Sequence, residues 1–221
     1  YFSLLVLLFW LSVKHARNMK SKAKIFTWIG KVCLLSALLL HLYNIYDNMN
    51  QDQNQKQILE QYIQETNHQQ DTSFIQIPDY QLNPEMEMPE VSIPGLEEAG
   101  CIGIIEIPSI NIKLPVLSTW SYSLLKKAPC RYTGSIYLDN MVIAAHNSDA
   151  HFKKISNLQE GDIVTFTDAV GNVFTYTVAG IELLQPNEVD NMTNGQWPLT
   201  LFTCTYGGAS RVTVRCEKNT E

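Results

Sequence analysis

The sequence has few cysteines, and their spacing fits neither a metal site nor a disulfide framework. Only 5 of the 221 residues are cysteines, and no paired CxxC motif is present. One of the five, Cys33, lies inside an apolar run near the N-terminus. We therefore interpret the cysteines as mostly free thiols and expect neither a bound metal nor a cofactor. The sequence also shows no internal repeat, which argues against a solenoid.

The chain also lacks an excess of positive charge. It has 16 Lys and Arg against 22 Asp and Glu, for a net charge of −6. No basic stripe with interleaved aromatic residues occurs in its C-terminal half. Because that stripe is what phosphate backbones require, we expect no nucleic-acid partner.

Long apolar runs occur only near the N-terminus. The first, at 1–13, is too short to cross a bilayer, which takes about 20 residues. The second, at 25–46, is long enough and predicts a transmembrane anchor. The residues before the span are basic and those after it are acidic: Lys14, Arg17, Lys20, Lys22 and Lys24, then Asp47 and Asp52. The positive-inside rule then places everything after the span outside the cell.

The alternative to an anchor is a cleaved signal peptide, but no small-x-small cleavage site follows Leu40. We expect four regions. Residues 1–24 form a cytoplasmic or non-native segment and 25–46 the anchor. Residues 47–99 form a stalk and linker, with apolar residues at helical spacing near Ile58 followed by several prolines. Residues 100–221 form the folded domain.

The folded region is mainly β, with eight short strands and few helices. The expected strands are 101–107, 110–116, 135–138, 141–145, 162–167, 173–184, 199–203 and 211–216. Short helices are expected at 122–127 and at 150–158, the second with Asp149 as its N-cap. Many short strands of this kind favour a closed β-barrel, which has no exposed edge.

The last two strands bring a thiol and a guanidinium together. In the first, Leu199 and Leu201 alternate with residues that include Cys204, and in the second Val212 and Val214 alternate with Arg211. If the Leu and Val side chains mark the core, Cys204 and Arg211 both point outward. A hairpin with regular pairing then puts them nearly opposite each other.

This pair predicts nucleophilic chemistry. A thiol with an ordinary pKa of about 8.5 is mostly protonated at neutral pH, and a nearby cation favours the thiolate. Arg211 stays charged and can stabilise an oxyanion. His146, at the end of an apolar strand, is the best candidate for the proton-transfer group, and His151 is its competitor. Arg215 shares the face of Arg211 and is the expected bystander.

These motifs resemble the active-site signature of the sortases. TLFTC at 200–204 with Arg211 on the next strand is similar to the family pattern, and VIAAHN at 142–147 is similar to its histidine strand. The resemblance covers roughly 100–218 and implies an eight-stranded sortase-type β-barrel after an N-terminal transmembrane helix. It implies Cys204 as nucleophile, His146 as general acid and base, and Arg211 as oxyanion or substrate stabiliser. A class B or class D-like enzyme fits best.

The resemblance also implies a function and partners. We expect a bacterial, single-pass membrane protein with its catalytic domain outside, which cleaves a C-terminal sorting signal of secreted proteins through a thioester. It would join the product to an amine of cell-wall precursor or pilin. Thr203, beside the nucleophile, is a candidate substrate-binding residue. Trp197 is a candidate for lining the peptide groove, with core or rim packing as the alternative.

Two other functions compete with this interpretation. A papain-like peptidoglycan hydrolase places Cys before His, and no His follows Cys204, so it would need Cys101 or Cys130 with His146 or His151. A non-catalytic barrel that binds a wall component predicts that replacing Cys204 has no effect. The remaining cysteines, Cys101, Cys130 and Cys216, are expected to be packing residues.

Overall fold

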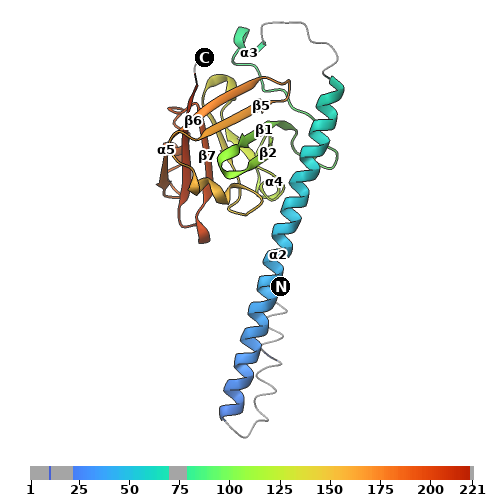
Figure 1. Ribbon diagram of the computed structural model, residues 1–221, viewed down its shortest axis with the longest axis vertical. Coiled ribbons are helices and arrows are strands. Elements are labelled where there is room, and N and C mark those ends of the chain that lie inside the picture. Colours follow the sequence, from blue (N-terminus) through green and yellow to red (C-terminus); the bar gives the residue numbers. More distant parts are fainter. Residues whose placement is uncertain (1–9, 11–21, 70–78, 220–221) are drawn as a thin grey trace. The chain divides into compact units, whose positions relative to one another are not determined.

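The computed structural model describes residue 10, residues 22–69 and residues 79–219 (Figure 1). The chain divides into two compact units, Tyr1–Asp47 and Asn48–Glu221. Most of the N-terminal segment predicted at 1–24, and residues 70–78 of the linker, lie outside the described residues. Helix α2 (Lys22–Gln69) begins in the first unit, where it carries the apolar run, and ends in the second. Its most apolar window has a mean hydropathy of 1.8, so this helix is long and apolar enough to cross a membrane.

The second unit contains a closed barrel of eight strands, as predicted from the sequence. The strands are β1 (Cys101–Ile107), β2 (Ile112–Leu117), β3 (Cys130–Thr133), β4 (Met141–Ala144), β5 (Ile163–Asp168), β6 (Val173–Leu184), β7 (Leu199–Cys204) and β8 (Arg211–Lys218). Their order around the barrel is β1-β2-β3-β4-β7-β8-β6-β5. The pairs β2–β3 and β4–β7 are parallel, and the other pairs are antiparallel.

One predicted strand is wrong and one real strand was missed, so the predicted count of eight still holds. The segment predicted as a strand at 135–138 is a short 3₁₀ helix, η2 (Ile136–Leu138). Ser135 caps this turn by accepting a hydrogen bond from the Tyr137 backbone N–H, 3.2 Å from its hydroxyl. Asp139 then leaves the turn in the left-handed region, at φ 51°. The missed strand is β3.

The helical pieces of the barrel domain are short. Helix α4 (Tyr122–Leu125) forms where a helix was predicted and is capped by Ser121. The other predicted helix is a 3₁₀ helix, η3 (Phe152–Asn157), and His151 rather than Asp149 occupies its N-cap position. Asp149 instead pairs with Lys153. The remaining pieces were not predicted: α3 (Asp79–Leu82), η1 (Pro108–Ile110), α5 (Val189–Thr193) and η4 (Tyr206–Gly208).

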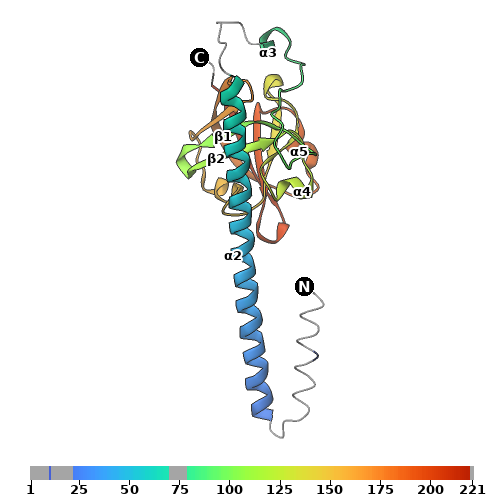
Figure 2. The ribbon, with the colours of Figure 1, turned by 90° about the vertical axis from the view of Figure 1, so that its right-hand side faces the viewer.

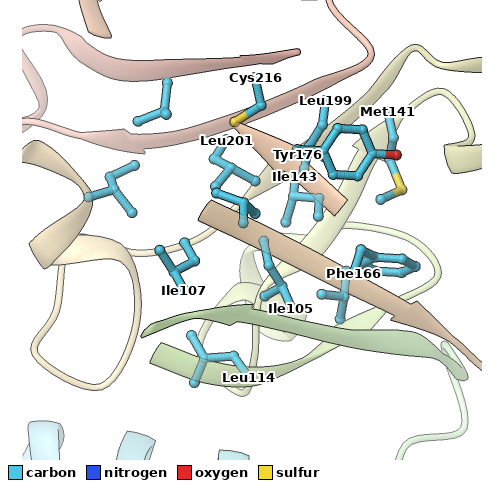
Figure 3. Packing of buried hydrophobic residues seen from close by; sticks show 14 of the residues in the cluster. Ile105, Ile107, Leu114, Met141, Ile143, Phe166, Tyr176, Leu199, Leu201 and Cys216 are labelled. Atoms are coloured by element: carbon cyan, nitrogen blue, oxygen red, sulfur yellow. The ribbon is translucent and has the colours of Figure 1, made fainter. Parts of the chain in front are cut away.

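The barrel interior is filled by apolar side chains from every strand except the short β3 (Figure 3). Alternation along the strands decides which side chains enter it. On β7, Leu199 and Leu201 are fully buried in this core, and on β8 Val214 and Cys216 are fully buried as well. The inward alternation predicted for these two strands is therefore confirmed.

The outer face of β1 and β2 is covered by the chain that precedes the barrel. Ile58 and Tyr62 of α2 pack there together with apolar residues of the 91–99 segment, against Cys101, Ile104 and Leu117. The Tyr62 hydroxyl donates a hydrogen bond to the Asp168 carbonyl oxygen at 3.0 Å. Figure 2 shows this part of α2 in front of β1 and β2. We call this surface the covered face. The domain boundary near Gly100 stays a prediction, and packed side chains extend well before it.

Candidate active site

Cys204 and Arg211 lie directly opposite each other on β7 and β8. The pairing register is regular along the two strands and ends with Cys204 against Arg211. Both side chains are half-buried and lie on the outer face, because their neighbours Thr203 and Val212 face inward. Directly paired residues have Cβ atoms about 5 Å apart. The prediction that Cys204 and Arg211 lie nearly opposite each other is therefore confirmed.

The parallel pairing of β4 with β7 determines where His146 lies relative to Cys204. Met141 is paired with Leu199 and Ala144 with Phe202, so partners differ by a constant 58 residues. The ladder continues one residue further, since the Ala145 N–H donates to the Phe202 carbonyl oxygen at 3.2 Å. At the same offset His146, two residues after the end of β4, comes level with Cys204. Adjacent strands lie about 4.8 Å apart, so this register places His146, Cys204 and Arg211 in one row along the ends of β4, β7 and β8. This outer face of β4, β7 and β8 is called the open face below.

Thr203 holds the backbone that leads to His146. Its side chain is only 2% exposed, and its hydroxyl donates a hydrogen bond to the Ala145 carbonyl oxygen at 2.8 Å. This bond joins the residue before Cys204 to the residue before His146, so it fixes the two strand ends relative to each other. The predicted contact of Thr203 with substrate stays a prediction.

A tight turn sets the position of Arg211. Gly207 and Gly208 adopt φ of 78° and 76°, which few other residues tolerate. The turn is closed by Thr205 and Ser210, whose backbone groups are joined by a 2.9 Å hydrogen bond. One guanidinium nitrogen of Arg211 donates to the Gly208 and Ser210 carbonyl oxygens, at 3.1 and 3.2 Å. A guanidinium carries further N–H groups, and groups of this kind can donate hydrogen bonds to an oxyanion.

The barrel that carries this row matches a known family. The family model described as Sortase domain matches residues 105–219, which is more than half of the chain. The chain belongs to the sortase family. That match covers all the strands of the barrel apart from the start of β1.

Several relatives are sortases of different classes. Sortase A of Bacillus anthracis is 30% identical over 124 residues, covering 53% of this chain and 59% of that protein. Sortase D of Bacillus subtilis (strain 168) is 27% identical over 106 residues, covering 46% of this chain and 53% of that protein. A sortase D5 transpeptidase of Clostridium perfringens superposes with a TM-score of 0.54 at 19% identity, over 76% of this chain and 97% of that one, and thus shares the fold. The class B or class D-like assignment stays a prediction.

The other cysteines of this sortase domain are packing residues, as predicted. Cys101, Cys130 and Cys216 are fully buried. Burial raises the pKa of each of their thiols to about 12. They are therefore protonated and inaccessible at neutral pH. Within the described barrel, Cys204 is the one cysteine that is not buried.

Arg215, the other outward arginine of β8, is held by structural contacts. Its side chain is 6% exposed and pairs with Glu182 at 2.7 Å. It also donates to the hydroxyl of Thr200 at 3.0 Å and to the carbonyl oxygens of Met192 and Asn191. These bonds occupy the guanidinium and fasten α5 to the barrel. The geometry therefore favours Arg211 over Arg215 for chemistry.

His151 is close to His146 but buried. It is 1% exposed, and burial lowers its pKa to about 4, with the nearby His146 adding to the effect. It is thus neutral near pH 7 and has no access to solvent. His146 is half-buried, so it remains the better candidate for proton exchange with a substrate.

Apolar and aromatic side chains extend along the open face away from the row. Phe202, on the same face of β7 as Cys204, packs edge-on against Tyr132 of β3, with ring centroids 5.3 Å apart. Trp120 continues this group, 5.1 Å from Tyr132. Sequence reasoning missed Phe202 and Tyr132, although the two-residue spacing of Phe202 from Cys204 was a usable signal. Trp197 is half-buried in the segment before β7, and its predicted role in a groove stays a prediction.

No group of three or more His, Cys, Asp or Glu side chains is arranged to hold a metal among the described residues.

Proposed function

We propose that this sortase is a membrane-anchored cysteine transpeptidase in which Cys204 is the nucleophile, His146 the general acid and base, and Arg211 the oxyanion stabiliser. The observation that carries the proposal is the row of these residues across β4, β7 and β8. A half-buried thiol between an imidazole and a permanent cation has the three groups that acyl transfer needs.

The proposed reaction has two balanced halves. The Cys204 thiolate attacks a peptide carbonyl, and Arg211 stabilises the oxyanion. The intermediate collapses to a thioester, the C–N bond breaks, and protonated His146 gives its proton to the departing amine. A second amine then loses a proton to His146 and attacks the thioester. A new amide bond forms and the Cys204 thiolate is released.

The open face supports a peptide substrate with apolar side chains. Val142, Leu184 and Met192 are buried together beside Tyr132 and Phe202 on the outside of the barrel. An extended peptide laid along this surface would meet the aromatic group before reaching the thiol. We therefore propose a sorting signal near the C-terminus of secreted proteins as donor, cleaved after a Thr. The acceptor is an amine of cell-wall precursor or of a pilin.

The N-terminal helix supports a location at the bacterial cell membrane with the barrel outside. The apolar part of α2 supplies a span, and basic residues precede it while Asp47 and Asp52 follow it. An outward-facing barrel on such an anchor would meet secreted proteins as they leave the membrane.

The rival hydrolase receives no support from the barrel. That function needs Cys101 or Cys130 as nucleophile, and both are fully buried with raised thiol pKa values. A buried, protonated thiol is a poor nucleophile. The wall-binding rival makes a different prediction about Cys204, which the following experiment tests.

The experiment is a transpeptidation assay on the full chain in detergent. The enzyme is incubated with a library of peptides that contain Thr before the scissile bond, with amines that mimic wall precursor or a pilin lysine. We expect amide product, and a thioester on Cys204 that mass spectrometry detects when the amine is scarce. Cys204→Ala should abolish both.

Matched controls separate the roles. Cys33→Ser removes the exposed thiol of α2, outside the barrel, and should leave turnover unchanged. Turnover by Cys204→Ala at the wild-type rate would refute the assignment and favour a binding barrel. A labelled thioester on Cys101 or Cys130 would favour the hydrolase.

A further inference from the structure

The loop after β4 folds back so that two histidines lie face to face. The Phe152 N–H donates to the His146 carbonyl oxygen at 3.1 Å, and the His151 N–H donates to the Ser148 carbonyl oxygen at 3.0 Å. These bonds close a tight turn over 146–152. The two imidazole rings are parallel within 7°, with centroids 6.4 Å apart.

His151 is fixed in this position by the core. It is 1% exposed, and Phe152 and Ile155, which follow it in η3, are fully buried in the barrel interior. The backbone that carries the His151 ring is therefore held by core packing on its C-terminal side. His146 is half-buried and lies parallel to this buried ring. The His151 ring therefore borders the space in which the His146 ring can lie.

The nitrogens of His151 make at most a weak hydrogen bond. Neither Nδ1 nor Nε2 forms a bond of ordinary geometry to a described residue, and only the Lys127 backbone lies near enough to favour the protonated ring. Buried imidazoles ordinarily use their nitrogens. A planar side chain that is stacked but unpaired contributes a surface against which another ring can rest.

The neutral state of His151 suits this role. With its pKa lowered to about 4, it carries no charge near pH 7. A second cation against His146 would disfavour the imidazolium that the proposed reaction needs. A buried neutral ring restrains His146 without that repulsion.

We propose that His151 is a positioning residue whose stacked ring holds the imidazole of His146 in the row with Cys204 and Arg211. This inference rests on the proposed function, because it assigns His151 an effect on that reaction. It adds a fourth side chain to the site, one that touches no substrate.

The first test compares His151→Phe, His151→Leu and His151→Ala in the full chain in detergent. Phe keeps a flat ring without nitrogens, and Leu keeps much of the volume without a flat ring. We expect Leu and Ala to lower kcat by about 10- to 100-fold, as a misplaced catalytic group does, with KM changed less than about 3-fold. We expect Phe to recover most of the activity lost in the Ala variant.

Two outcomes overturn the proposal. If Phe is as inactive as Ala, the nitrogens matter and the ring faces do not. If Leu and Ala turn over like the wild type, no restraint is needed. Thermal melts of all three variants identify loss of fold, which would lower the active fraction rather than kcat per folded molecule.

A second test does not depend on turnover. In full-length chain labelled with ¹³C-histidine, the His146 ring signal is assigned by its loss in His146→Gln. We expect this signal to stay sharp in His151→Phe, and to shift and broaden in the Leu and Ala variants as the ring samples several rotamers. An unchanged signal in all three would refute the positioning role. A wild type with the expected spectra but no activity on any peptide would instead refute the proposed function.

Discussion

The covered face and the open face of the barrel show how one architecture serves two purposes. On β1, residues of both faces are buried, because α2 and the 91–99 segment pack on the outside. On β7, the inward side chains are buried while Phe202 and Cys204 remain half-exposed on the outside. Burial on both sides produces an almost continuous apolar strand, and burial on one side produces alternation. The alternating strands are the ones that leave room for chemistry.

The largest effect should come from comparing two arginines of the same strand. We expect Arg211→Ala to lower kcat/KM by about 100- to 1,000-fold, as loss of an oxyanion donor does, with little change in Tm. Arg215→Ala should instead destabilise the fold by about 2–3 kcal/mol, since it leaves a buried network incomplete. Peptide kinetics and thermal melts on both variants measure this. Equal losses of kcat/KM in the Arg211 and Arg215 variants would mean that the two arginines do not have separate catalytic and structural roles.

The stability of the fold should depend on pH because of the buried His151 near the open face. The pKa of His151 falls from 6.5 to about 4 on folding, so the unfolded chain binds this proton more tightly. Stability is therefore full above about pH 6.5 and decreases as the pH falls toward 4, by about 3 kcal/mol in total. His151→Phe removes this contribution, so its melting temperature should fall less than that of the wild type between about pH 7 and pH 4. Parallel pH profiles would contradict the low pKa.

Shortening a side chain on the covered face should lower the stability of the fold and leave catalysis unchanged. Ile58 is 5% exposed and packs on the covered face. We expect Ile58→Ala to cost about 2–3 kcal/mol of unfolding free energy because it leaves a cavity. Turnover per folded molecule should stay near the wild-type value. Ile63→Ala, an exposed position on the same helix, is the control and should be nearly neutral. A large fall in kcat for Ile58→Ala would show that the two faces are coupled.

The smallest effect concerns the bond between the two strand ends of the site. Thr203→Val keeps the shape and removes the hydroxyl that donates to the Ala145 carbonyl oxygen. We expect a loss of about 1 kcal/mol in stability and a fall of a few-fold in kcat, because Ala145 precedes His146. Thr205→Val removes a hydroxyl from the β7–β8 turn and serves as a comparison. A drop in peptide affinity alone would instead favour the substrate contact predicted for Thr203.

Local pattern was enough to predict the hairpin of β7 and β8 and hence the pairing of Cys204 with Arg211. Strict alternation and two glycines at the turn define both the strands and their register. The strand β3 was missed because it is only four residues long, and the apolar η2 segment that follows it looked more like a strand. The hydrogen bond from the Tyr137 N–H to the Ser135 hydroxyl favours the 3₁₀ turn over a strand there.

The rest of the site depends on contacts that no local pattern contains. The level of His146 relative to Cys204 follows from a parallel pairing between segments 58 residues apart. The stacking of His151 on His146 follows from how η3 is seated in the core. The covering of β1 depends on a helix that begins far earlier in the chain. Its place at a strand end and the family resemblance both indicated His146, and the fold supplied its neighbours.

The contacts of α2 with the barrel have a mechanical consequence under the proposal that this helix is a membrane tether. The Asp168 carboxylate, next to the carbonyl that Tyr62 binds, also accepts hydrogen bonds from Tyr137, Asn172 and the Val170 backbone, so the turn between β5 and β6 is braced. Tension along α2 would enter the barrel at this turn and at β1 and β2, against which Ile58 and Tyr62 pack. Since none of β1, β2 and β5 pairs with β4 or β7, the load would reach the proposed reacting groups only after crossing other strands.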